Sequence, residues 1–130
     1  METKSIVGVK SYQFALKIIR VYQLLTKDKR EFILSKQLMR SATSIGANVN
    51  EGLFAESKKD FIHKLHIALK ETRETLYWLN LLRDSDYLEE VTFLALKGDC
   101  DQISKILSSI ILTTKQKYLS KTGKEMNTVD

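Results

Sequence analysis

The sequence predicts an all-α protein, an up-down-up-down antiparallel bundle of four helices. Proline is absent and glycine occurs only five times in 130 residues, so few positions interrupt a helix. Apolar residues recur at steps of three and four along four long segments, the spacing of one face of an amphipathic helix. Short polar links between these segments are typical of antiparallel neighbours. The length indicates a single domain, here residues 1–119.

The first two predicted helices cover residues 11–26 and 31–52. The first has an apolar stripe of Phe14, Ile18, Val21 and Leu25. A polar link, residues 27–30, leads to the second, whose seam consists of Leu34, Leu38, Ala42, Ile45 and Val49. We expect Gly52 to end this helix in the left-handed conformation that favours glycine.

The last two predicted helices cover residues 57–83 and 89–119. Ser57 and Asp60 have the spacing of a capping box at the start of the third helix. The core positions of the third helix are Phe61, Leu65, Ala68, Thr72, Leu76, Leu79 and Leu82. Those of the fourth are Phe93, Leu96, Cys100, Ile103, Leu107 and Ile110. We expect a disordered C-terminal tail over residues 120–130.

Composition favours a soluble cytoplasmic protein. Hydrophobic residues make up 43% and charged residues 28% of the chain, as in ordinary globular domains. The single cysteine, Cys100, cannot form an internal disulfide, which suits a reducing compartment. No apolar run approaches the roughly 20 residues that span a bilayer, and the N-terminus lacks the apolar core of a signal peptide. We therefore expect no membrane partner.

The positive charge is concentrated at the two ends of the chain. Residues 1–40 hold nine Lys/Arg against three acids, whereas residues 41–104 hold seven against eleven. Residues 105–130 are basic again, with five against two. Such an uneven distribution suits a polyanion or an acidic partner, although a solvated surface remains an alternative. The candidate nucleic-acid-binding residues are Lys17, Arg20, Lys27, Lys29, Arg30 and Lys36.

The segment 40–52 has a polar row beside a strip of small residues. The row consists of Arg40, Ser44, Asn48 and Glu51, and it can meet Glu71 and Glu74 of the third helix. We interpret it as a clamp between helices or subunits, with a ligand or RNA contact as the alternative. Small neighbours allow a helix to approach and exclude water, so loss of Arg40 is expected to cost about 3–5 kcal/mol. An exposed row would instead lose under about 1 kcal/mol.

The third and fourth helices carry more apolar residues than one bundle core requires. This surplus predicts an oligomer interface, with a broad core as the alternative. The candidate interface residues are Tyr77, Trp78, Leu81, Ile106 and Ile111.

No arrangement of side chains predicts catalysis, a metal or another cofactor. Di-iron bundles need two Glu-x-x-His pairs, which are absent, and His63 with His66 supplies only two ligands at a spacing of three. Cys100 lies on an apolar stripe, where it is expected to act as a small hydrophobe. The chain has neither a phosphate-binding glycine loop nor a nucleophile elbow.

Two segments resemble the family of four-helix proteins encoded in intervening sequences of bacterial large-subunit (23S) ribosomal RNA genes. They are residues 40–52, RSATSIGANVNEG, and residues 67–79, IALKETRETLYWL, with Phe61 between them. Members usually carry Ala where Asn50 stands, and Glu71 places this chain in the Lys-Glu-x-x-Glu branch. The resemblance implies a bundle that assembles into a homopentameric ring. It also implies kinship with accessory proteins of diversity-generating retroelements, basic pentamers that associate with a reverse transcriptase and nucleic acid.

Together these features predict a non-enzymatic oligomeric scaffold or adaptor. Its partners are expected to be further copies of itself, and RNA or DNA or a nucleic-acid-processing protein that contacts a basic surface. The alternative is a helical assembly module without affinity for nucleic acid.

Overall fold

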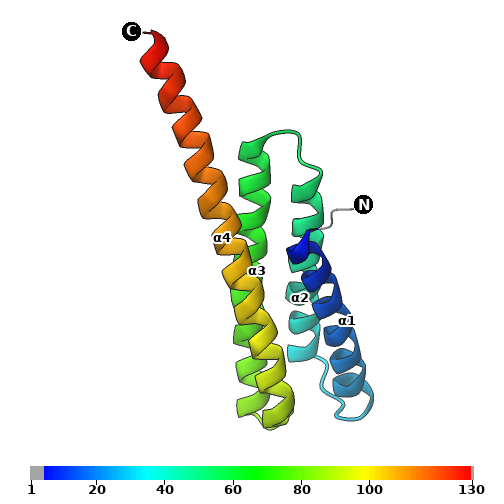
Figure 1. Cartoon of the computed structure of the whole chain (residues 1–130). Helices are drawn as coiled ribbons and strands as arrows, with labels where there is room; N and C mark the ends of the chain where they lie inside the picture. Colours follow the sequence, from blue (N-terminus) through cyan, green and yellow to red (C-terminus); the bar gives the residue numbers. More distant parts are fainter. Residues whose placement is uncertain (1–4, 130) are drawn as a thin grey trace.

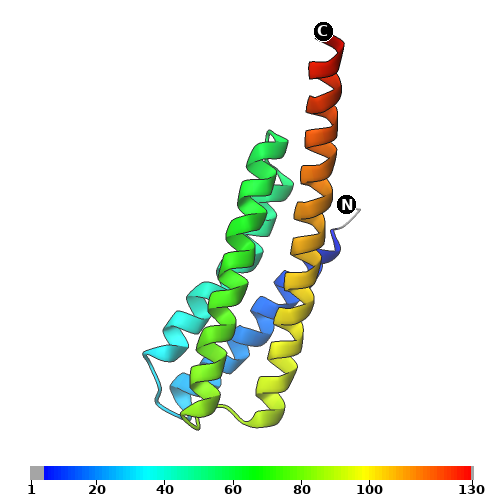
Figure 2. The same ribbon diagram turned by 90° about the vertical axis from the view of Figure 1, so that its left-hand side faces the viewer.

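The computed structural model describes residues 5–129, with side chains through Leu119, and all regular elements in this part are α-helices. They are α1 (Ile6–Lys27), α2 (Leu34–Leu53), α3 (Lys58–Asp84) and α4 (Glu90–Val129). Successive helices run in opposite directions and pack side by side, and α1 also touches α4 (Figures 1 and 2). The predicted four-helix bundle is confirmed.

All four helices contribute to one continuous core. The predicted apolar stripes supply most of it, with Val21, Leu34, Phe61, Leu76 and Ile110 half-buried at its edges. Outside those stripes, the core also contains Val7, Leu69, Leu88 and Ile111. Its fully buried large side chains are Phe14, Ile18, Leu25, Leu38, Ile45, Leu65, Leu79, Leu82, Phe93, Ile103 and Leu107. Cys100 belongs to this core, and burial, reinforced by Asp101 and Asp99, raises the pKa of its thiol to about 12. The thiol is therefore protonated at neutral pH.

Helix α1 begins earlier than the apolar stripe predicts. Ser5 is its N-cap, because the Ser5 hydroxyl accepts a hydrogen bond from the Gly8 backbone N–H at 3.0 Å. At the start of α3, Ser57 likewise caps the helix and accepts from the Asp60 N–H at 3.1 Å. The cap predicted at Ser57 is confirmed, whereas the reciprocal bond to the Asp60 side chain that would complete a capping box is not among the described hydrogen bonds.

Helix α2 begins at Leu34 rather than at residue 31, because Glu31 caps it from outside. The Glu31 carboxylate accepts from the backbone N–H groups of Ile33, Leu34 and Ser35 at 3.1, 2.9 and 2.7 Å. Burial opposes ionisation of Glu31, but these hydrogen bonds together outweigh it and lower the pKa of the carboxyl. One acidic side chain thus satisfies three N–H groups that would otherwise lack partners.

Gly52 does not adopt the left-handed conformation predicted for it. It lies within α2 and is buried, and no glycine among the described residues has positive φ. A side chain at this position would stand 3.3 Å from Cβ of Lys64 and 3.5 Å from Leu65 of α3. The glycine therefore permits close packing of α2 on α3. The left-handed turn positions are Arg30 and Asp86 instead.

Helix α4 ends at Val129, beyond the predicted end at residue 119. Its C-terminal part extends past the other helices (Figures 1 and 2). The described backbone has no break near Leu119, as expected from the absence of proline. Side chains beyond Leu119 lie outside the described residues, and disorder of residues 120–130 in solution stays a prediction.

Candidate nucleic-acid interface

The predicted basic residues lie on α1, the α1–α2 turn and the start of α2, and all six are exposed. Lys17 is neutralised, because its Nζ lies 2.9 Å from Asp99 Oδ2 on α4. Within the described chain, the other five form no ion pair: Arg20, Lys27, Lys29, Arg30 and Lys36. Most of the predicted cations are therefore available to a partner.

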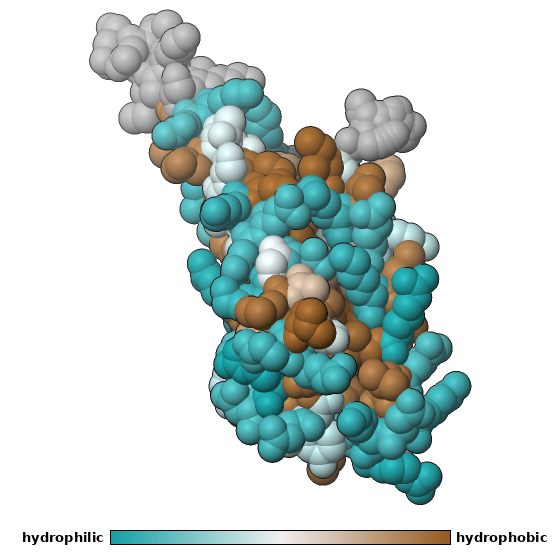
Figure 3. All heavy atoms as spheres, turned by 60° about the horizontal axis from the view of Figure 1, so that its bottom comes forward, coloured by the Kyte–Doolittle hydropathy of each residue, from teal (hydrophilic) through white to brown (hydrophobic). Residues whose placement is uncertain are grey.

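Acidic residues nevertheless surround part of this group. The α3–α4 turn lies at the same end of the bundle as the α1–α2 turn (Figure 1). Lys29 lines one shallow hollow with Asp86, Glu89 and Glu90, and a second with Asp28 and Glu89. This end is largely hydrophilic where it comes forward in Figure 3. The charge at this end is therefore mixed. The sequence does not show this, because the acids of the α3–α4 turn lie far from Lys29 along the chain.

A second set of basic residues, which the sequence analysis did not select, lies along the outer face of α3. We call Lys59, His63, His66, Lys70 and Arg73 the α3 basic stripe; all five are exposed. They follow one another at steps of four and three, so one helix face carries them all. The stripe is about 21 Å long at 1.5 Å per residue. The sequence does contain this pattern: basic residues repeat at steps of four and three, one position after the core residue Leu65 and two after Ala68.

Helix α4 adds a further charge beside this stripe. Burial lowers the pKa of His66, and the positive charges of Lys115 on α4 and of His63 and Arg73 lower it further. Lys59, Lys70, Arg73 and Lys115 have no ion-pair partner among the described residues. The potential along this face is therefore positive.

The predicted polar clamp forms only in part. Arg40 donates to Glu74 Oε2 at 2.7 Å and also to Gln37. Ser44 and Asn48 bond to backbone carbonyls of their own helix, and Glu51 pairs with Lys64 at 2.8 Å. A buried contact that was not predicted, between the hydroxyls of Ser41 and Thr75 at 2.9 Å, joins α2 and α3 more deeply. Gly46 lets α1 approach, since an added Cβ would stand 3.5 Å from the Ser11 hydroxyl.

The Arg40–Glu74 pair is accessible to water, contrary to the expectation of a shielded clamp. The side chains of Arg40 and Glu74 are 58% and 32% exposed. Screening by solvent makes such a pair weak, so Arg40→Ala is expected to lower the free energy of unfolding by under about 1 kcal/mol. Urea denaturation measures this change. A loss above about 3 kcal/mol would restore the shielded clamp.

Glu71 lies beside this pair but has no hydrogen-bond partner at one oxygen. Its Oε1 is buried without a partner among the described residues. Burial, with repulsion from Glu74, raises the pKa of the Glu71 carboxyl, and the Arg40 charge compensates only in part. Ionised Glu71 is thus a local cost to the fold at neutral pH.

Glu71→Gln is expected to stabilise the protein at neutral pH by about 1 kcal/mol, because it removes this unsatisfied charge. A raised pKa in the folded state means that native stability falls as the pH rises from the unfolded value, about 4.3, through the folded value. The advantage of the variant should therefore disappear near pH 4. Denaturation at both pH values tests this, and a variant less stable than the native protein at pH 7 would refute it.

The predicted interface residues do not form one exposed surface. Ile111 is buried in the core, Trp78 and Ile106 pack half-buried against it, and Leu81 is also half-buried. Only Tyr77 is largely exposed, at 57%. For Ile111 the broad-core alternative is correct.

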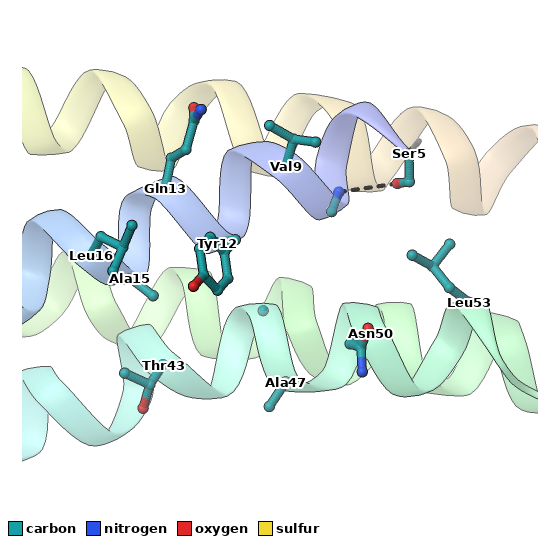
Figure 4. A pocket seen from close by; sticks show the side chains of 12 residues that line it. Ser5, Val9, Tyr12, Gln13, Ala15, Leu16, Thr43, Ala47, Asn50 and Leu53 are labelled. Carbon is teal, nitrogen blue, oxygen red and sulfur yellow. Dashed lines mark hydrogen bonds between the residues drawn. The ribbon is translucent and has the colours of Figure 1, made fainter. Parts of the chain in front are cut away.

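A larger apolar surface lies between α1 and α2. There a groove of about 810 Å³ is lined by Ser5, Gly8, Val9, Tyr12, Gln13, Ala15, Leu16, Thr43, Gly46, Ala47, Asn50 and Leu53. Figure 4 shows Tyr12 pointing from α1 across the groove towards α2, with Ala47 and Asn50 on the opposite wall. Val9, Tyr12 and Leu16 are exposed, at 47%, 66% and 39%. Small residues on α2 keep the groove open.

Two further observations concern other site types. Among the described residues, no group of three or more His, Cys, Asp or Glu side chains is arranged to hold a metal ion. No helix in the described part of the chain is long and apolar enough to cross a membrane.

The protein is thus a small four-helix bundle with basic faces. Its second helix contacts α3 through Arg40 and Glu74, and small residues let the helices approach closely. The chain belongs to the 23S rRNA-intervening sequence protein family, whose profile matches residues 3–109. It is similar to a crystal structure of a protein of unknown function from the S23 ribosomal protein family of Bacteroides thetaiotaomicron VPI-5482. The two share 46% identity and a TM-score of 0.81, over 82% of this chain and 95% of that one. No curated protein matches the chain.

Proposed function

We propose that the protein is a non-enzymatic oligomeric scaffold or adaptor that associates with nucleic acid, or a nucleic-acid-processing partner, through a basic surface. The observation that carries the proposal is the set of exposed cations without carboxylate partners in the described chain, on α1, the α1–α2 turn and α3. Cations free of internal partners can neutralise phosphates and release their counterions.

Assembly is proposed to use the α1–α2 groove, occupied by a second copy of the chain. The groove and the exposed Val9, Tyr12 and Leu16 form an apolar surface that a second helix pair could cover. A homopentamer is the favoured assembly, by resemblance to the family, and the cytoplasm the favoured compartment. A ring would place several basic faces on one particle and so strengthen weak binding to a long polyanion.

The state of the single cysteine, Cys100, supports a non-enzymatic role. Cys100 is 2% exposed and stays protonated at neutral pH, so it is neither accessible nor activated.

Binding to unrelated RNA and DNA sequences is expected to be similar and to weaken steeply between about 50 and 200 mM salt, because phosphate attraction carries it. Fluorescence anisotropy with labelled random oligonucleotides measures both properties. Removal of co-purified nucleic acid with nuclease beforehand is the necessary control.

The second candidate is an assembly module without affinity for nucleic acid. It is favoured by the acidic residues around Lys29, which reduce the attraction of the α1–α2 turn for phosphate. Absence of salt-sensitive binding even at low ionic strength would select it.

A further inference from the structure

The α3 basic stripe has fewer exposed, unpaired acids near it than the α1–α2 turn has, so it should attract phosphate more strongly. Its helix also carries acids, and of these Asp60 alone is both exposed and without an ion pair among the described residues. Glu74, next to the stripe, is paired with Arg40 at 2.7 Å, and Glu71 is partly buried against α2. Across the helix interface, Glu51 is paired with Lys64. Asp60, in the first turn, is the exposed acid nearest to His63 along the helix.

An exposed aromatic side chain continues the stripe. Tyr77 follows Arg73 after a further step of four, so it lies on the same face as the five basic residues. It is 57% exposed, and its ring stands against Trp78 in an edge arrangement with centroids 5.0 Å apart. Trp78 is itself fixed, since its Nε1 donates to Glu74 Oε2 at 3.2 Å. Tyr77 is therefore supported by its neighbour and still accessible to a base.

Cations followed in line by an accessible aromatic ring match the chemistry of a single strand. The cations attract phosphates, and the ring offers a surface on which an unpaired base can stack. A duplex keeps its bases stacked inside and would use only the charges. The stripe, about 21 Å long, is long enough to contact several successive phosphates of a strand.

We propose that the outer face of α3 is a binding surface for single-stranded nucleic acid, formed by Lys59, His63, His66, Lys70 and Arg73 with Lys115 of α4, and by Tyr77 as the stacking platform. This inference rests on the proposed association with nucleic acid. It adds where on the protein the nucleic acid binds and that the bound form is single-stranded.

His66 makes this surface sensitive to pH. The charged and titratable groups facing His66 are Lys115 from α4 and His63 and Arg73 from α3. These disfavour a charge on free His66, whereas a phosphate beside it would favour protonation. Binding should therefore take up protons and tighten as the pH falls.

Two charge-matched variants test the location. Lys59→Glu, Lys70→Glu and Arg73→Glu reverse three cations of the stripe, and Lys27→Glu, Lys29→Glu and Arg30→Glu reverse three at the α1–α2 turn. Both change the net charge from +5 to −1, so any difference reports position rather than total charge. With labelled single-stranded RNA, the stripe variant should lose about 100-fold in affinity and the turn variant under about tenfold. Equal losses, or a larger loss in the turn variant, would overturn the proposal.

A third variant tests the strandedness. Tyr77→Leu should weaken single-strand binding about tenfold and leave duplex binding unchanged, since only the single strand stacks. Native affinity should also rise from about pH 7.5 to about pH 5.5, more than in the His66→Gln variant. Equal effects of Tyr77→Leu on both substrates would contradict a stacking surface. No binding by the native protein at low salt would instead refute the proposed function itself.

Discussion

Replacing Tyr12 and Leu16 together with glutamate is expected to reduce the particle in solution from about five chains to one chain of 15.0 kDa. Both side chains line the α1–α2 groove and are exposed in the single chain, at 66% and 39%. Charges there cost little in the isolated bundle but would be buried without partners in an assembly that fills the groove. Light scattering coupled to size exclusion measures the mass.

The matched control is Val91→Glu with Leu94→Glu. These two apolar residues of α4 are also exposed, at 74% and 54%, and lie outside the groove. The control should keep the native mass, and circular dichroism should show helical content unchanged in both variants. If the groove variant stays assembled while the control dissociates, the interface lies on α4.

Glu31→Ala is expected to destabilise the fold by about 2–3 kcal/mol at neutral pH, because three N–H groups at the start of α2 lose a charged acceptor. The pKa of Glu31 is lowered in the folded state, so its stabilisation is present above the unfolded pKa of about 4.3. That stabilisation is lost as the pH falls through the lower folded value. Chemical denaturation between pH 7 and pH 3 measures the difference.

Glu56→Ala is a suitable comparison, since Glu56 is an exposed acid near the α2–α3 turn with no described ion pair. It should change the stability by under about 0.5 kcal/mol at every pH. A Glu31→Ala protein as stable as this comparison at pH 7 would show that the cap contributes little.

Core periodicity predicted the fold well because burial acts through helix spacing alone. Leu38, Ala42, Ile45 and Val49 repeat at steps of four and three, and each is fully buried. Helix ends were predicted less well where long-range or unusual contacts decide them. Glutamate is common inside helices, so the sequence placed Glu31 in α2. It caps the helix instead, because the backbone turns at Arg30 and brings the Glu31 carboxylate to the first N–H groups of α2. Glycine often ends a helix, but at position 52 the reason for a glycine is the close approach of Lys64 on α3.

The candidate site was harder to predict because charge acts between segments far apart in sequence. The middle of the chain is acidic overall, which concealed a basic face on α3 whose neighbouring Glu74 is paired with Arg40 of α2. Lys17 appeared free until the fold placed Asp99 beside it, and Lys29, although unpaired, shares two hollows with Glu89. Ile111 appeared surplus until the pairing of α3 with α4 buried it. Spacing shows which residues share a face, and only the packed helices show what that face meets.

Co-elution of a labelled single-stranded RNA of about 20 nucleotides with the nuclease-treated protein at low salt tests the central claim most directly. With light scattering on the same column, we predict that the RNA elutes with a particle containing several chains and is released at high salt. Free RNA beside a protein of unchanged elution position, at low salt and at concentrations well above those of a weak complex, would contradict it.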